Sequence, residues 1–239
     1  MVLTDKHLQI ATALTFDGGN GTAFIGDTVD LGTNRRIESG KPLYVRCTFT
    51  ESASASASAL NAKTEFRFRV AALSSLSNFG AVSSVVTVEA GDDYNLFTLA
   101  GHGLVNGSRL NVAATSTGLV TTRPYYVINA TADTFQISWL PGGVASTALS
   151  TTNATVTFTP HSECVGSSGP TPIQQTQIGD VIHVALNPTP FNQGVPLARY
   201  LFCEVIRSGG TSTAGEVSMA LVLDASDYAT YYASGFTVE

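Results

Sequence analysis

The stretch EFRFRV, at Glu65–Val70, places an apolar side chain at every second position and a charged one between them. Successive side chains of an extended chain point to opposite faces, so this period of two predicts a β-strand with one buried face. The arginines of the stretch then lie on the solvated face. The segment LYVRCTFT, at Leu43–Thr50, has the same period and predicts a second half-buried strand.

The same alternation recurs along the chain. It predicts further strands at Leu8–Phe16, Val181–Leu186, Tyr200–Val205 and Glu216–Leu223. Clusters of Gly, Pro and Asn separate these segments, as expected for tight turns, and no segment of the sequence has a sustained helical period. We therefore expect an all-β protein, with a jelly-roll-like antiparallel β-sandwich and an inserted small β-barrel-like module.

The middle of the chain has a strand set of its own, predicted at Asn95–Leu99, Arg109–Val112, Tyr125–Asn129, Phe135–Ser138 and Thr155–Phe158. Insertions into loops disturb packing least, so we expect a small β domain of residues 89–160 inserted into a discontinuous sandwich of residues 1–88 and 161–225. Residues 226–239 form a separate C-terminal tail in this scheme. The Ser/Ala stretch Glu51–Ala59 has no large apolar group and predicts a long exposed loop.

The composition limits the possible partners. Only 13% of the 239 residues are charged, whereas about 25% is usual, and this favours a surface covered by other proteins over one that stays wet. The net charge is −6 without a Lys/Arg cluster, so we expect no nucleic-acid partner. No apolar run is long enough to cross a membrane. The odd number of cysteines argues against a disulfide framework and fits a reducing cytoplasm: Cys47, Cys164 and Cys203.

No reactive arrangement of side chains is visible. None of the histidines has metal-ligand spacing, and neither a nucleophile elbow nor a phosphate loop is present: His7, His102, His161 and His183. His102 lies between two glycines, which predicts a local hydrogen-bonding role. We expect no enzyme, no cofactor and no metal. Two alternatives stay open: a pair of carboxylates of a glycan-active enzyme, and a Ca²⁺ site in the loop Asp17–Thr22 with Asp27 and Asp30.

Two stretches of the middle module carry a resemblance. They read LFTLAGHGLVNGSRL at Leu96–Leu110 and RPYYVINATADTFQIS at Arg123–Ser138. The order of Gly-His-Gly-Leu, Asn-Gly, a Tyr-Tyr-Val-Ile strand and a Phe-Gln-Ile strand resembles a small β repeat found in phage virion proteins. The resemblance implies a phage structural context and says nothing about chemistry.

Three stretches of the surrounding frame are similar to podophage capsid cement, or decoration, proteins: Val29–Phe49, Gly166–Ile173 and Ala198–Asp224. The shared features are Asp-Leu-Gly before Gly-x-Pro-Leu-Tyr-Val, then Gly-Ser-Ser-Gly, and an Arg-Tyr-Leu strand that leads to a Gly-rich hairpin. The resemblance implies a homo-oligomer, made in the host bacterial cytoplasm, that binds the outer capsid surface of a tailed-phage virion. Its implied partners are the major capsid protein and itself, with a homodimer favoured and a homotrimer possible. The inserted module and the tail depart from the family pattern.

Two further hypotheses concern binding. The tail contains four aromatic side chains without an evident core to join, and we predict that they dock on a neighbouring copy or on the capsid: Tyr228, Tyr231, Tyr232 and Phe236. The alternative function is a tail or receptor-binding component of the virion that contacts host surface glycans. In that case Trp139, Tyr125 and Tyr126 are the candidates for stacking on sugars, although core aromatics are the commoner role.

Overall fold

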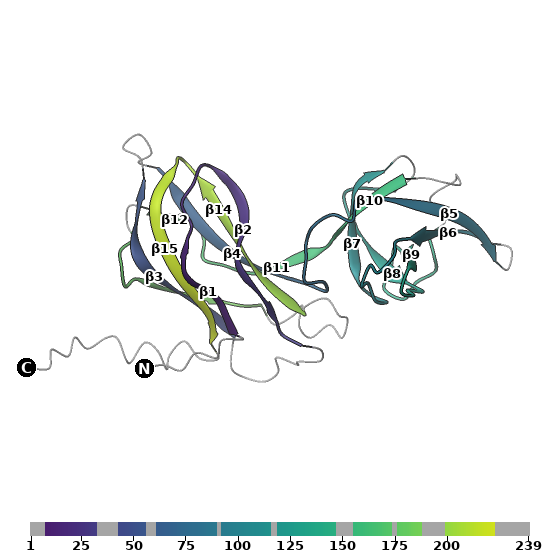
Figure 1. The fold of residues 1–239 in the computed structure, drawn as a ribbon, viewed down its shortest axis with the longest axis horizontal. Coiled ribbons are helices and arrows are strands. Elements are labelled where there is room, and N and C mark those ends of the chain that lie inside the picture. The colour runs from purple at the N-terminus through teal and green to yellow at the C-terminus, as the bar shows by residue number, and fades with distance from the viewer. Residues whose placement is uncertain are drawn as a thin grey trace, which may run out of the picture.

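A computed structural model describes residues 8–32, 43–55, 61–89, 92–115, 119–146, 155–173, 176–187 and 199–222. The regular elements in these ranges are β-strands, arranged as two sheets that face each other and one closed barrel (Figure 1). The predicted all-β sandwich class is thereby confirmed. None of these ranges contains a helix with the length and apolar character that a membrane span requires.

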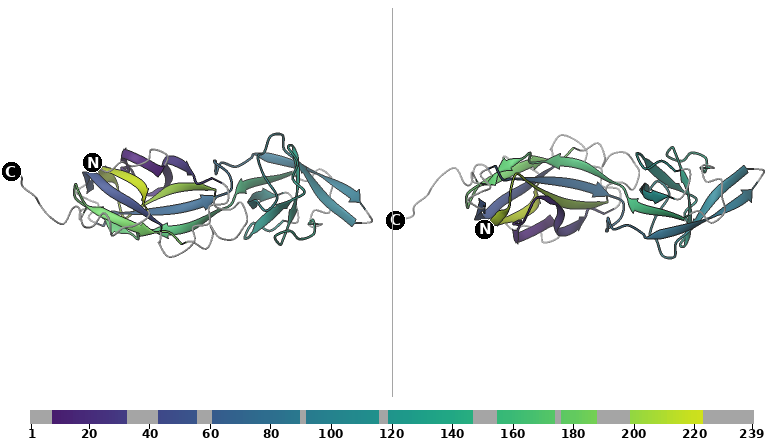
Figure 2. Two further views of the ribbon diagram at one scale, coloured as in Figure 1. Left: turned by 90° about the horizontal axis from the view of Figure 1, so that it is seen from below. Right: turned by 90° about the horizontal axis from the view of Figure 1, so that it is seen from above.

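The sandwich is built from the two ends of the described chain. Sheet 1 has the order β1 (Gln9–Thr15), β15 (Ser212–Val222), β3 (Tyr44–Ala55) and β13 (Val181–Ala185). Sheet 2 has the order β11 (Ser162–Ser167), β4 (Lys63–Ala71), β14 (Tyr200–Ser208) and β2 (Gly21–Asp30), and the short β12 (Thr171–Pro172) also pairs with β4. All these pairs are antiparallel. Figures 1 and 2 show the sandwich from three sides.

The pairing follows a simple rule. Leaving out β12, the first strand pairs with the last, β2 with β14, β3 with β13, and β4 with β11. The sandwich is therefore one long antiparallel hairpin wrapped into two sheets, and its tip lies between β4 and β11. The barrel occupies this tip.

Close backbone contacts at two glycines join the edges of the sheets. A Cβ on Gly26 of β2 would overlap the carbonyl oxygen of Ile10 on β1, and one on Gly166 of β11 would lie 2.9 Å from that of Ala185 on β13. Gly26 has a φ of +74°, which L side chains rarely adopt. Because a strand of the other sheet lies against each of these edges, they are shielded from pairing with another chain.

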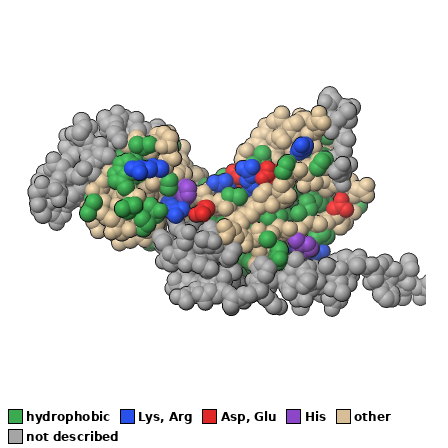
Figure 3. Space-filling model, turned by 180° about the vertical axis from the view of Figure 1, so that it is seen from behind, with side chains coloured by type: hydrophobic (Ala, Val, Ile, Leu, Met, Phe, Trp, Pro, Cys, Tyr) green, Lys and Arg blue, Asp and Glu red, His purple; other side chains and the backbone are tan. Residues whose placement is uncertain are grey.

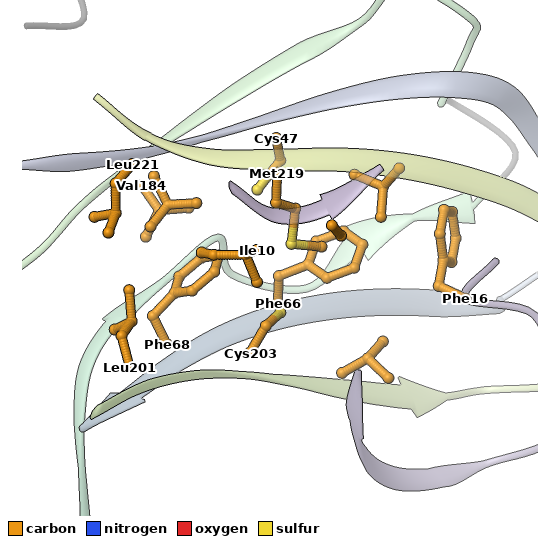
Figure 4. Packing of buried hydrophobic residues seen from close by; sticks show 14 of the residues in the cluster. Ile10, Phe16, Cys47, Phe66, Phe68, Val184, Leu201, Cys203, Met219 and Leu221 are labelled. Atoms are coloured by element: carbon orange, nitrogen blue, oxygen red, sulfur yellow. The ribbon is translucent and has the colours of Figure 1, made fainter. Parts of the chain in front are cut away.

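The core lies between the two sheets and follows the predicted alternation (Figure 4). Phe66 and Phe68 point inward from β4, and the ring of Phe16 meets that of Phe66 edge to face at 5.5 Å. Cys47 and Cys203 are buried free thiols, as their positions on apolar faces predict. Burial raises the pKa of Cys47 to about 12, so this thiol is protonated and acts as a small apolar side chain.

The barrel is continuous in sequence. It closes in the order β10 (Thr155–Pro160), β5 (Ala81–Glu89), β6 (Asp92–Thr98), β9 (Thr134–Ser138), β8 (Pro124–Ile128) and β7 (Arg109–Thr115), which pairs again with β10. Three phenylalanine rings form the centre of its core: Phe97 stacks on Phe135 at 5.4 Å and meets Phe158 edge to face at 5.0 Å. Figures 1 and 2 show the barrel beyond one end of the sandwich.

Two predicted boundaries differ from the structure. The barrel begins at β5, near residue 81 rather than residue 89, because this valine-rich strand pairs with β6 and β10. The predicted loop Glu51–Ala59 is wrong for residues 51–55, which continue β3 and pair with β15. Backbone hydrogen bonds to β15 and the burial of Ala53 keep this stretch extended although its side chains are small.

Candidate interaction surface

The outer face of sheet 2 brings together side chains from three strands. We call Phe24, Arg67, Arg69, Phe202 and Glu204 the Phe24 face. Glu204 of β14 lies opposite Phe24 on β2 and opposite Arg67 on β4, while Phe202 lies opposite Arg69. The alternation that buries Phe66 and Phe68 turns the two arginines outward, as the sequence predicts. In Figure 3, basic and acidic side chains lie close together on the sandwich, with hydrophobic ones around them.

The apolar part of the face is a pair of phenylalanines. Phe24 is 49% exposed on the edge strand β2, and its ring meets that of Phe202 edge to face at 6.1 Å. Phe202 is only 7% exposed, so it supports Phe24 from below. A half-exposed ring seated on a buried one is a preorganised anchor for another protein surface.

A partly buried ion pair lies beside the phenylalanines. Arg69 Nη1 lies 3.4 Å from Oε2 of Glu204, whose side chain is only 12% exposed. The same guanidinium donates from Nε to Ser162 Oγ at 2.8 Å and from Nη2 to the Ser162 carbonyl at 3.0 Å. These donors fix the plane of the guanidinium and link β4, β14 and β11 on the outer surface.

The second arginine of the face, Arg67, and the neighbouring Arg109 are also paired with carboxylates. Arg67 donates to both carboxylate oxygens of Glu65 at 2.6 and 3.3 Å, and Ser167 Oγ donates to the same carboxylate at 2.7 Å. The Arg67 hydrogen bond is the main reason why the pKa of Glu65 lies below its ordinary value. At the barrel end, Arg109 pairs with Glu163 at 3.1 Å. The surface is therefore electrically balanced and rigid, which suits a neutral protein partner better than a polyanion.

Among the described residues, no group of three or more His, Cys, Asp and Glu side chains is placed to hold a metal ion. Two of the groups proposed for Ca²⁺ have other partners: the Asp30 carboxylate binds Arg199 at 2.9 and 3.1 Å, and Asn20 Oδ1 accepts from the Gly210 amide. His102 Nδ1 accepts the Leu104 amide at 2.9 Å, which confirms its predicted local role.

The aromatic residues suggested for sugar stacking are engaged in the barrel. Tyr125 is fully buried, and its hydroxyl accepts the Val120 amide at 2.8 Å, so the stacking role is wrong for this residue. Trp139 packs against Tyr125 at 4.9 Å, and the Arg123 guanidinium carbon lies 3.1 Å from the centre of its ring. Arg109 lies over the ring of Tyr126. The predicted tail residues Tyr228, Tyr231, Tyr232 and Phe236 lie outside the described residues, as does His7.

The Phe24 face is not apparent in the sequence. Alternation marks Arg67 and Arg69 as outward-facing, but Phe24 lies in GTAFIGDTVD, where adjacent Phe and Ile give no clear period. Its position depends on the pairing of β2 with β14, which joins residues about 180 positions apart. Local sequence patterns cannot predict a pairing over that distance. The available signal was compositional: a phenylalanine in a segment of mostly small or polar residues.

Comparison with known proteins adds no relative: no protein-family description, no curated protein and no solved structure matches this chain.

Proposed function

We propose that this chain is a non-enzymatic decoration protein, or cement protein, of a tailed-phage capsid. In this role it binds the outer surface of the head and bridges major capsid subunits. Internal DNA pressure pushes the joints between subunits apart, and a rigid protein bound across a joint adds its binding free energy to the closed state. The sites of action are the virion surface and, before assembly, the host bacterial cytoplasm.

The sequence resemblance and the topology support this proposal together. The stretches Val29–Phe49 and Ala198–Asp224, which resemble capsid cement proteins, form neighbouring strands of the sandwich: β3 pairs with β15, and β2 pairs with β14. Pairing of the first strand with the last, and so on inward, agrees with the jelly-roll sandwich that the resemblance implies, and so supports the proposal.

The Phe24 face is the observation that carries the proposal. Protein interfaces are enriched in aromatic and arginine side chains, and their energetic centre is a well-packed anchor within a polar rim. Phe24 on Phe202 supplies the anchor, and the two paired arginines supply the rim without a net charge to repel a capsid surface.

A binding assay on capsids tests the proposal. Purified heads that lack this protein are mixed with the full chain or with its Phe24→Asp variant, and bound protein is measured after sedimentation. We expect Phe24→Asp to weaken binding by about tenfold or more, because a charge replaces the apolar anchor (about 1.4 kcal/mol per tenfold). The matched control is Ile178→Asp, which changes a 68% exposed side chain away from the Phe24 face and leaves binding unchanged.

Two results would overturn the proposal. One is equal capsid binding by Phe24→Asp and the unaltered chain. The other is the copy number in purified virions: a decoration protein is present in hundreds of copies, whereas a handful of copies per particle indicates the tail or receptor-binding alternative.

A further inference from the structure

The barrel carries a second apolar surface, away from the Phe24 face. Val120, Leu140 and Val144 are 42%, 67% and 88% exposed. Val120 lies in the loop before β8, and the other two lie in the loop that follows β9. Together with Arg123 they form what we call the Trp139 patch: Val120, Arg123, Trp139, Leu140 and Val144. In Figure 3, hydrophobic side chains of the barrel gather around a basic one. Exposed aliphatic side chains that cluster in this way indicate an interaction site.

The Trp139 patch is anchored in the barrel core. Trp139 lies between the Arg123 guanidinium, at 3.1 Å, and the ring of buried Tyr125, at 4.9 Å. The Tyr125 hydroxyl in turn accepts the Val120 amide, which joins the loop before β8 to the core. The Gly143 amide donates to the Leu140 carbonyl at 3.1 Å and closes the turn that carries the exposed aliphatic groups. The patch therefore binds as a preformed surface, with little ordering needed.

The charge of the patch restricts its partner. Arg123 is one of only two basic residues between residues 81 and 160, and no carboxylate of the described residues pairs with it. Its guanidinium lies over the indole ring, with its carbon 3.1 Å from the ring centre, which leaves N–H donors able to bind a carboxylate. The patch thus fits a segment that combines aromatic or aliphatic side chains with acidic ones.

The C-terminal segment of this chain has that composition. Residues 224–239, DASDYATYYASGFTVE, contain four aromatic and three acidic residues and no Lys or Arg. We propose that this segment of a neighbouring copy docks on the Trp139 patch, with its rings on Val120, Leu140 and Val144 and a carboxylate on Arg123. The proposal is independent of the capsid role and of the Phe24 face.

The reach of the segment favours a neighbouring copy. β15 ends at Val222, opposite Tyr44 of β3, and Tyr44 also lies opposite the last residue of β13. Gly166 of β11 is in close contact with that end of β13, so the end of β15 lies near the level of Gly166. From there β11 runs five residues, about 16 Å, to the start of the barrel, and the patch lies beyond that point. Tyr228 is six residues past Val222 and extends at most about 20 Å. Placing all four rings, Tyr228 included, on the patch of its own copy would hold residues 223–228 nearly straight, with a large loss of conformational entropy.

The single tryptophan makes the proposal directly measurable, because all tryptophan emission of the chain comes from Trp139. In a dilution series of the full chain, we expect a red shift of this emission as copies separate, with a parallel loss of the oligomer in light scattering. A chain that ends at Leu223 should show the red-shifted emission at all concentrations. Adding a peptide of residues 224–239 should reverse the shift.

Point variants of the full chain locate the contact. Val144→Asp and Arg123→Glu should each weaken self-association by about tenfold or more, since they oppose an acidic, apolar segment. Val105→Asp is the matched control on the barrel, at a side chain that is 50% exposed outside the patch, and it should leave association unchanged. Association of Val144→Asp equal to that of the unaltered chain would overturn the proposal. So would emission that is independent of dilution, which means docking within one copy or no docking.

Discussion

The sandwich and the barrel bring their strands together over very different distances along the chain. The barrel is made of one continuous segment, β5 to β10, and its core is a compact group of aromatic rings around Phe97, Phe135 and Phe158. The sandwich joins strands from both ends of the chain, and paired residues of β1 with β15 and of β2 with β14 are 170 or more positions apart. The barrel can form from contacts between residues close in sequence. The sandwich forms most readily when the inserted barrel holds the end of β4 and the start of β11 near each other.

The ends of the barrel suit the place where it is inserted. Ala81, at the start of β5, lies opposite Thr157 near the end of β10, so the chain enters and leaves the barrel side by side. β4 and β11 require the same arrangement, because Ala71 lies opposite Ser162. A folded barrel therefore acts as a short connection at the hairpin tip, and the sandwich closes almost as if the insertion were absent.

The largest expected effect comes from removing one core ring in each unit. Phe135→Ala should destabilise the barrel and Phe66→Ala the sandwich, each by about 3–5 kcal/mol, the range for large cavities in packed cores. The consequences should differ. An unfolded barrel turns the short connection into a loop of roughly 90 residues, which destabilises the sandwich by about 2 kcal/mol through loop-closure entropy. An unfolded sandwich leaves the barrel ends free and the barrel intact.

Denaturant unfolding distinguishes these outcomes. Trp139 emission follows the barrel, and amide hydrogen exchange of β14 follows the sandwich. Phe135→Ala should lower both transitions and Phe66→Ala only that of the sandwich. If Phe66→Ala lowered the Trp139 transition by the same amount, the two units would unfold as one, and the comparison above would be wrong.

A smaller effect is expected where the sandwich closes at Gly26. Gly26 and Gly32 have nearly equal φ angles, +74° and +75°, but a Cβ overlaps the Ile10 carbonyl at Gly26 and meets nothing within 4 Å at Gly32. Gly32→Ala should destabilise by about 1 kcal/mol through backbone strain alone. Gly26→Ala should cause the same backbone strain and also force β1 away from β2, so its total loss of stability should be about 2–4 kcal/mol. The difference between the two variants in thermal unfolding measures the closing contact, and equal values would show that β1 and β2 can move apart freely.

Local patterns predicted what local geometry controls. The period of two placed Phe66, Phe68, Cys47 and Cys203 in the core, since side-chain alternation needs only an extended backbone. The glycine-flanked His102 was predicted to bond locally, and its ring accepts an amide two residues away. These features depend on sequence neighbours and not on the way that sheets assemble.

Features that depend on pairing were missed. β2, with Phe24, lacks a clear period and is recognisable only beside β14. Residues 51–55 carry small side chains typical of a loop and extend because β15 lies next to them. The predicted start of the barrel was too late in the chain, because a run of valines predicts a strand but does not indicate which sheet that strand joins. The Phe24 face combines β2, β4 and β14, so its recognition required the register of all three strands.

The smallest effect concerns the junction between the two units, at His161. It is the single residue between β10 and β11: its amide donates to the Arg109 carbonyl, and its Nδ1 lies 3.0 Å from Asn111 Oδ1 on β7. Burial is the main cause that lowers its pKa, followed by the charge of Arg109; Arg69 acts in the same direction and Glu163 against it.

Since the pKa of His161 in the folded protein lies below the ordinary value of 6.5, the unfolded chain binds the proton more readily. The neutral ring therefore contributes stability above about pH 6.5, and this contribution is lost as pH falls through the lower, folded value. Glu65 and Asp30 have lowered pKa values and stay ionised in this window, so they do not mask the effect. We expect the protection factors of the His161, Ser162 and Glu163 amides, that is, their exchange relative to an unfolded chain at the same pH, to fall between pH 7 and pH 5.

The variant His161→Asn keeps a donor near Asn111 but cannot titrate, so the protection factors of the amides of residues 161–163 should depend less on pH. His183→Asn is the comparison within the sandwich: burial and Arg46 lower the pKa of His183 as well, but it lies on β13, away from the junction. That variant should leave the pH dependence of the protection factors of residues 161–163 unchanged. An equal response of both variants would mean that pH acts on the whole protein, whereas a response of His161→Asn alone would show that the link between barrel and sandwich titrates separately from either core.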